Sequence, residues 1–424
     1  MKRNIVVLTL ILALLFPSSL LAIAPQTDEV QPYALMLKEA IDLTLKNSPD
    51  LQKADVMVGL VERGKIDSKN LYRNVDTGVR GGIGNLKQQL KATEAKQAYL
   101  VAQTGGDPDL LHLLTPDLAA LEVQKQAITY SLSGLDILKD ARDDIEDVKE
   151  GFEDGYDDAL RIRKDADKKI SFGVEKLYLS MLSLQDFIVV QKDNVSLQQR
   201  LREIEEIKYQ NGLSTAVDVA KASQKVRDEE ERLNDLKNTY VLLTYQMNRN
   251  IGREWDAPLV LAPTVFDPVE IGDIEEVYEK ALEASLEVEQ YNRTIHDKEH
   301  DIIKNKRHSD VVNKLKLQIQ DTELKLEQTK YNIQNTLEGL RYQYRNAQKM
   351  VVNKTNKYGT TKVEYEQAKV LCKQEMGLQV QLEGSELLMK KAKSEYLKAL
   401  YDYYLATREL QIAQDGIFLA KVKA

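Results

Sequence analysis

The chain has 424 residues, a formal net charge of −8, one cysteine, nine prolines and twenty glycines. A single cysteine, Cys372, cannot form a disulfide within the chain, which excludes a disulfide-stapled fold. No proline lies in residues 117–257 or 269–424. Because proline costs roughly 3 kcal/mol in a helix interior, its absence from two runs rich in Glu, Lys, Leu and Ala indicates long helices and excludes an all-β fold.

The first 24 residues have the pattern of a secretory signal peptide. Lys2 and Arg3 precede an apolar run from Ile5 to Phe16, and a small-x-small cleavage site follows at Ala22-Ile23-Ala24. The apolar run is shorter than the ~20 residues of a membrane-spanning helix. We therefore expect residues 1–24 to be removed and the mature chain to be exported and to act outside the cytoplasm.

The mature chain is predicted to lack a spanning helix and a nucleic-acid partner. No later segment reaches 18 consecutive apolar residues. The acidic net charge argues against nucleic acid, because binding to phosphates requires clusters of basic residues.

Three prolines within eleven residues mark a linker over residues 255–268. It separates a first half, residues 25–254, from a second half, residues 269–424. The openings of the halves line up, residues 37–51 with 274–288: each predicts a short amphipathic helix with an acidic start and a serine near its break. Deeper in each half, residues 208–213 line up with 372–378, so that Gly212 matches Gly377, and this Gly-Leu step precedes a long helical pattern. The order predicted twice is a short helix, a long helix, a turn and a long helix.

Heptad patterns follow both Gly-Leu steps. Apolar or small positions alternate at spacings of four and three, which keeps one seam facing a partner helix in a left-handed supercoil. The seam of the first half is Val219, Ala222, Val226, Leu233, Leu236, Tyr240, Leu243 and Met247. The seam of the second half is Leu382, Ser385, Met389, Ala392, Tyr396, Ala399, Tyr403, Ala406, Leu410, Ala413 and Ile417.

A second apolar stripe lies beside the seam of the second half. It is formed by Leu397, Leu400, Tyr401 and Tyr404. Two adjacent stripes predict neighbours on both sides, as in a multi-helix wall, although one broad face in an ordinary bundle core fits the same periodicity.

The region from residue 66 to 170 is less regular. Loops are expected at residues 78–84 and 104–108, and the weak alternation of Leu71, Val75, Val79 and Ile83 suggests at most one strand pair. The acidic stretch over residues 140–158 suggests a solvated helical face.

Three local patterns resemble chemical sites. Residues 59–66 almost fit a phosphate-binding loop, but Ile66 replaces the Ser or Thr that holds Mg²⁺. The stretch from His296 to His300 has the H-x-x-E-H spacing of zinc peptidases, among charged neighbours typical of a wet surface. Residues 154–158 lack the alternating ligands of a calcium loop. We expect no enzyme, cofactor or metal site. A metal-dependent hydrolase at His296 and His300 is the hypothesis that these patterns leave open, behind the two non-enzymatic functions given below.

The motifs together resemble the TolC-type outer-membrane efflux protein family. The internal duplication carries the resemblance, together with the opening motif from Ala40 to Leu51, the Y-x-x-G-L-x-x-x-x-D-V run from Tyr209 to Val219, and the helix end Asn248 to Gly252. The resemblance implies a homotrimeric export conduit in the cell envelope, at the outer membrane or facing the periplasm, whose partners are a periplasmic membrane-fusion adaptor and an inner-membrane pump. It also implies adaptor-contact turns at Gly212, Leu213, Gly377 and Leu378, and acidic positions near an aperture at Asp218 and Glu383.

Two departures from the family are visible. Gln374 and Gln379 stand where the second turn of the family often has Tyr and Arg, which puts the usual aperture latch in doubt. Only 103 residues separate Ile274 from Gly377, too few for a long helix pair plus membrane strands.

The fold expected is therefore all-α, with long antiparallel coiled-coil helices in two structural repeats, a TolC-like helical duct with little or no β-barrel. An export conduit is the first functional hypothesis, and a structural coiled-coil scaffold of the cell envelope is the alternative.

Overall fold

A computed structural model describes residues 34–78, 93, 94, 96, 138–264, 266 and 274–419. The chain from Leu35 onward forms one compact unit. The predicted signal peptide lies outside the described residues. Among the helices that the structure describes, none is long and apolar enough to cross a bilayer.

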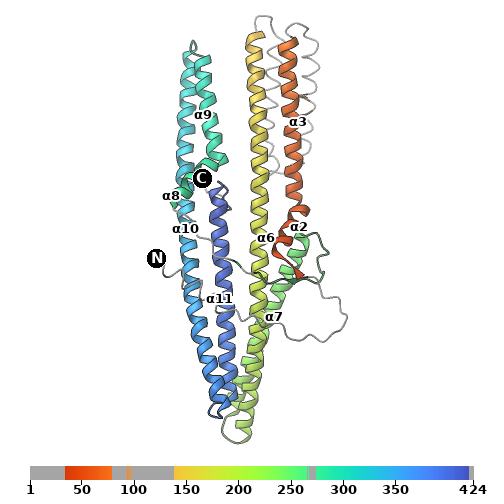
Figure 1. Cartoon of the computed structure of the whole chain (residues 1–424), viewed down its shortest axis with the longest axis vertical. Coiled ribbons are helices and arrows are strands. Elements are labelled where there is room, and N and C mark those ends of the chain that lie inside the picture. The colour runs from red at the N-terminus through yellow and green to blue at the C-terminus, as the bar shows by residue number, and fades with distance from the viewer. Residues whose placement is uncertain are drawn as a thin grey trace. The chain divides into compact units, whose positions relative to one another are not determined.

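In the part of the chain that the structure describes, the first repeat has four helices in the predicted order (Figure 1). The short helix α2 (Leu37–Asn47) leads into α3 (Pro49–Gly78), and α6 (Leu138–Gln210) is followed by α7 (Ala216–Asn250). Helix α3 packs against the earlier part of α6, where the Gly64 backbone approaches Phe152, and α7 packs against its later part. The 73 residues of α6 thus connect two helix pairs along one rod.

The second repeat has the same order. The short helix α8 (Ile274–Ala284) leads into α9 (Leu286–Lys304), and α10 (Ser309–Lys373) is followed by α11 (Gln379–Gln414). Helix α10, with 65 residues, packs first against α9 and then against α11. The expected all-α fold of long antiparallel helices in two structural repeats is confirmed. The residue boundaries predicted for the two halves stay predictions.

The break between the first two helices is built alike in both repeats. Ser48 and Ser285 have nearly the same backbone angles, φ −69° and ψ 117° against φ −71° and ψ 116°. Each serine Oγ accepts a hydrogen bond at 3.4 Å from the amide three residues later, in Leu51 and Val288. These residues are the ones that the sequence openings align, so the duplication extends to the hydrogen bonds of the break.

A glycine at the end of the last helix of each repeat lies against this break. Gly252 and Gly416 both have φ +74°, the left-handed conformation that terminates helices and favours glycine. A Cβ on Gly252 would lie 2.6 Å from the Asn47 side chain, and one on Gly416 would lie 2.5 Å from the Ala284 backbone. The ends of α7 and α11 are therefore fixed against the starts of their own repeats.

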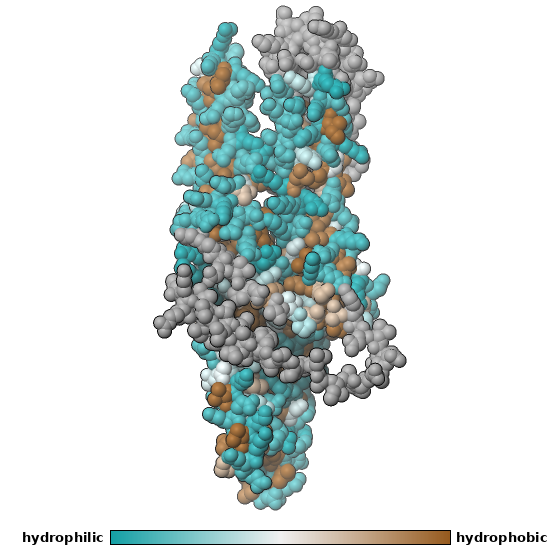
Figure 2. All heavy atoms as spheres, in the orientation of Figure 1, coloured by the Kyte–Doolittle hydropathy of each residue, from teal (hydrophilic) through white to brown (hydrophobic). Residues whose placement is uncertain are grey.

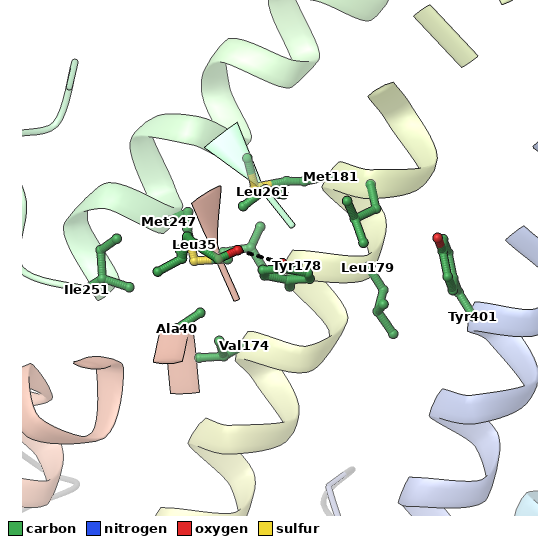
Figure 3. Packing of buried hydrophobic residues seen from close by; sticks show 12 residues of the cluster. Leu35, Ala40, Val174, Tyr178, Leu179, Met181, Met247, Ile251, Leu261 and Tyr401 are labelled. Atoms are coloured by element: carbon green, nitrogen blue, oxygen red, sulfur yellow. Dashed lines mark hydrogen bonds between the residues drawn. The ribbon is translucent and has the colours of Figure 1, made fainter. Parts of the chain in front are cut away.

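The largest apolar cluster is centred on Tyr178 of α6, which is fully buried (Figure 3). Its hydroxyl lies 2.7 Å from the carbonyl oxygens of Leu35 and Ala262. These carbonyls belong to or follow the two-residue strands β1 (Ala34–Leu35) and β2 (Val260–Leu261), which pair with each other. The buried members of the cluster are Leu35, Ala40, Val174, Leu177, Tyr178, Leu179, Met181, Leu182, Met247, Ile251, Leu261 and Tyr401. Tyr178 thus pins the linker and the N-terminal strand onto α6.

Helix α11 lies between α10 and α6, as its two apolar stripes predict. Ala399 and Tyr403 of the heptad seam pack with Val351 of α10. Tyr401 of the second stripe joins the cluster of Tyr178, while Leu397 and Tyr404 pack at its edge. Neighbours on both sides are therefore confirmed for this helix.

One sequence expectation in the first repeat was wrong, and another holds except at Asp158. Residues 71–78 continue α3, because the four-residue spacing of Leu71, Val75 and Val79 is a helical period; residues 79–84 and 104–108 lie outside the described residues. The acidic stretch is helical where described, but it is not simply solvated. Asp158 is only 6% exposed, and it accepts hydrogen bonds from Gln290 and Arg293 of α9.

Ion pairs join α6 to the second repeat. Asp147 pairs with Lys304 at 2.8 Å, and Asp193 pairs with Lys390 at 2.9 Å. The carboxylate of Glu175, which is nearly buried, accepts hydrogen bonds from the guanidinium of Arg408 at 3.3 Å. Ion pairs also join helices within one repeat, as Glu395 of α11 does with Lys354 and Lys357 of α10, so charges supplement the apolar contacts both within the repeats and between them.

Candidate functional site

The first turn, residues 211–215, joins α6 to α7 and is closed by its own backbone. Gly212 has φ +72°, and the Leu213 amide donates to the Lys208 carbonyl at 2.8 Å. The Ser214 hydroxyl and the Lys208 ammonium both donate hydrogen bonds to the Glu205 carboxylate. These bonds lower the pKa of the Glu205 carboxyl group, and the bond from Ser214 has the larger effect. The turn is therefore fixed from within, and it leaves Leu213 79% exposed at its apex.

The second turn, residues 374–378, joins α10 to α11 with the same bonding but a different register. The residue with positive φ is Glu375, at 59°, and the Met376 amide donates to the Leu371 carbonyl at 3.0 Å. Glu375 therefore corresponds to Gly212, and the sequence alignment of Gly377 with Gly212 was wrong by two positions. Gly377 is needed for another reason: a Cβ there would lie 3.2 Å from the Cys372 backbone nitrogen.

With this register, both turns expose apolar side chains at the same two positions. Ile207 and Val370, five residues before the positive-φ residue, are 59% and 51% exposed. Leu213 and Met376, one residue after it, are 79% and 68% exposed. Sequence reasoning missed Ile207, Val370 and Met376. The available signal was an apolar residue off the heptad seam beside a turn.

Additional apolar side chains surround both turns. Tyr209 and Val217 beside the first turn, and Leu371 and Leu378 beside the second, are between 45% and 65% exposed. Figure 2 shows apolar side chains among hydrophilic ones at the lower end of the view, where both turns lie in Figure 1. Gatherings of exposed apolar groups are typical of interaction surfaces.

The two predicted acidic positions have local partners. Asp218 forms a capping box with Thr215 at the start of α7, and hydrogen bonds from the Thr215 hydroxyl and amide lower the pKa of the Asp218 carboxyl group. Glu383 of α11 accepts from Arg200 of α6 at 2.7 Å and from Gln379 at 3.1 Å. The structure does not bring Asp218 and Glu383 together as a pair, because the Asp218 carboxylate binds Thr215 and the Glu383 carboxylate binds Arg200 and Gln379.

The Arg200–Glu383 contact matters for the placement of the turns. It lies twelve residues before Gly212 and eight after Glu375, so it couples the stems of both hairpins close to their ends. Further from the turns, Lys390 of α11 forms a second ion pair between the stems, with Asp193 of α6, and it also pairs with Glu386. The two exposed apolar apices are therefore held at the ends of stems that are linked to each other by ion pairs.

The other sequence motifs lie in ordinary helices. Residues 59–66 are within α3, and residues 154–158 are within α6. His296 and His300 are exposed on α9. Within the described residues, no group of three or more His, Cys, Asp or Glu side chains is arranged to hold a metal ion.

The fold resembles solved outer-membrane channels at low sequence identity. CusC, whose crystal structures concern folding and transmembrane channel formation, aligns with a TM-score of 0.53 and 10% identity over 89% of this chain and 91% of that one. The outer-membrane channel OprN gives 0.51 and 11% over 91% of both chains. The outer membrane protein VceC of Vibrio cholerae gives 0.50 and 10%, over 91% and 97%.

No family model matches the sequence, and no curated protein matches it. The likeness is therefore one of fold, spread over most of each chain. The two repeats of paired helices thus give this protein a fold similar to that of these solved outer-membrane channels.

Proposed function

We propose that the chain is the conduit component of an export system and docks a periplasmic adaptor through its two turns. The fold of the outer-membrane channels supports the conduit. The docking role is carried by one observation, the pair of apolar residues that each turn exposes at equivalent positions. Two equivalent apices suit a partner that presents the same apolar surface more than once. Gly212, Leu213, Gly377 and Leu378 belong to the contact surface, and Met376 is added to it.

The conduit also requires self-assembly, which we propose to be a homotrimer in the cell envelope. Helix α10 exposes Leu317, Leu324 and Tyr331, which are seven residues apart and between 59% and 68% exposed. Such a stripe is half of a coiled-coil seam whose partner is not found in the described part of the same chain. A Leu324→Lys variant is expected to weaken assembly, measured as the mass of the purified particle.

Near the turns, Asp218 and Glu383 are proposed to set how tightly the end of the conduit closes. The Arg200–Glu383 pair couples the two stems, so Glu383→Gln should let them separate more readily. The expected result is faster reaction of a thiol probe with a cysteine placed at Leu378. An unchanged rate would argue against an aperture role for Glu383.

Site-specific cross-linking tests the docking proposal. Single cysteines at Leu213, Met376 and Leu378 are placed in a Cys372→Ser background, since Cys372 is the one native thiol. Cross-links to an adaptor are expected from all three positions, and not from a control cysteine at Lys237, which is exposed in the middle of α7. Products that contain only this chain, or none, would favour the alternative, a structural coiled-coil scaffold without transport.

A further inference from the structure

The turn between α9 and α10 forms the other end of the second repeat, and its charge differs from that of the rest of the chain. Five basic residues and one acidic residue lie between Ile303 and Lys316, which gives this segment, called here the basic tip, a net charge of +4. The chain carries −8 in total, so the remainder carries −12. The basic members are Lys304, Lys306, Arg307, Lys314 and Lys316, and the acidic one is Asp310.

Most of these charges are available to a partner. Lys304 pairs with Asp147 at 2.8 Å. Lys306, Arg307, Lys314 and Lys316 are exposed and have no carboxylate within 4.0 Å in the described part of the chain. A helical hairpin that needed these side chains for its own stability would pair or bury them, so their free charge points outward to a ligand.

Apolar side chains stand among the basic ones. Ile303, in the last turn of α9, is 58% exposed, and Val311, in the first turn of α10, is 42% exposed. Basic residues interleaved with exposed aliphatic residues fit the interface of an anionic bilayer, where phosphates attract the cations and the aliphatic groups enter the headgroup boundary. A soluble polyanion would make use of the charges alone.

The charge distribution along the molecule favours an end-on orientation at such a surface. Helix α10 has 65 residues, so it holds the basic tip about 97 Å from the second turn at 1.5 Å per residue. Charges are screened beyond about 8 Å at physiological salt, so an end-on approach keeps most of the acidic body out of reach of an anionic surface; only the acidic start of α6 lies beside the tip, where its Asp147 pairs with Lys304. A side-on approach would bring the acidic body against it.

From charge, exposure and position, we propose that the basic tip docks end-on to the surface of a bilayer that contains anionic phospholipid. The proposal stands apart from adaptor docking, because it concerns the opposite end of α10. It gives the chain a peripheral membrane contact made by residues 303–316, without any spanning segment in them.

Vesicle binding of the full chain tests the proposal, with phosphatidylcholine vesicles that contain or lack phosphatidylglycerol. The Lys306→Gln, Arg307→Gln double variant is expected to bind the anionic vesicles about 30-fold more weakly, because each basic residue near an anionic surface contributes about a fivefold factor. The matched control, Lys225→Gln with Lys237→Gln on exposed positions of α7, removes the same charge and should bind like the parent. All variants carry the same N-terminal segment, so its contribution cancels.

An Ile303→Ser variant separates a bilayer from other anions. It should weaken binding to the anionic vesicles while leaving the retention of polyphosphate or DNA unchanged, and inorganic phosphate at equal phosphate concentration should not displace the vesicles. Equal vesicle binding by parent and double variant would overturn the proposal. So would a lack of effect of Ile303→Ser together with displacement by the soluble anions, since the tip would then be a general polyanion site.

Discussion

Replacing Gly416 by alanine should destabilise the protein more than the same change at any open glycine. Gly416 has φ +74°, and an L-residue in this conformation costs about 1–2 kcal/mol. The new Cβ would also lie 2.5 Å from the carbonyl carbon and oxygen of Ala284. These are backbone atoms of the break between α8 and α9, which cannot rotate away, so overpacking adds about 1–3 kcal/mol. The expected loss in the free energy of unfolding is about 2–5 kcal/mol.

Two matched variants isolate the contributions. Gly212 has φ +72° with no atom within 4 Å of a new Cβ, so Gly212→Ala should lose only the backbone part, about 1–2 kcal/mol. Gly384, inside α11 with the same open space, should gain about 0.5–1 kcal/mol as alanine. Urea unfolding followed by helical circular dichroism gives all three values. If Gly416→Ala loses no more than Gly212→Ala, the end of α11 does not lie against the break as described.

Three more variants test the packing around α11. Ala399→Trp, at a position 5% exposed between α10 and α11, should lower the melting temperature through an overpacking cost of about 1–3 kcal/mol, and an unchanged melting curve would show that the heptad register is wrong. Burial raises the pKa of Tyr401 to about 12 from about 10, so the folded state keeps the phenol proton to a higher pH than the unfolded chain, and the free energy of unfolding should fall between about pH 10 and 12. Tyr401→Phe should reduce that fall in unfolding curves measured at alkaline pH. Identical curves for the variant and the parent would contradict the burial of Tyr401. Arg408→Gln should cost about 1–3 kcal/mol, because the buried Glu175 loses its charged partner and keeps only the Tyr404 hydroxyl, and adding Glu175→Gln should recover much of the loss in a double-mutant cycle.

The helices of this fold could be predicted because their signals are local and repeated. The absence of proline, the heptads and the serines at both breaks each constrain a short stretch of chain, and two copies of every signal made the order clear. Ser48 and Ser285 were aligned correctly because a serine at a helix break is selected by its own backbone hydrogen bonds.

The register of the second turn could not be predicted from the same kind of signal. Glycine is the usual residue at positive φ, so Gly377 was aligned with Gly212, whereas Glu375 adopts that conformation and Gly377 provides a close backbone approach. The exposed Ile207 and Val370 were missed for a related reason, since an apolar residue near a turn could equally be part of the core. The partners of Asp158 and Glu175 come from helices more than 130 residues away, and no sequence periodicity shows which charge they meet.

The unbroken length of α6 and α10 has a mechanical consequence. Each of these helices begins beside one partner helix, α3 for α6 and α9 for α10, and ends at a turn beside another, α7 for α6 and α11 for α10. A twist applied at either turn is therefore transmitted along α6 or α10. The shorter helices α7 and α11 end where Gly252 and Gly416 pack against the breaks at Ser48 and Ser285. Because no loop interrupts α6 or α10, a force applied at one end of either helix is transmitted to its other end.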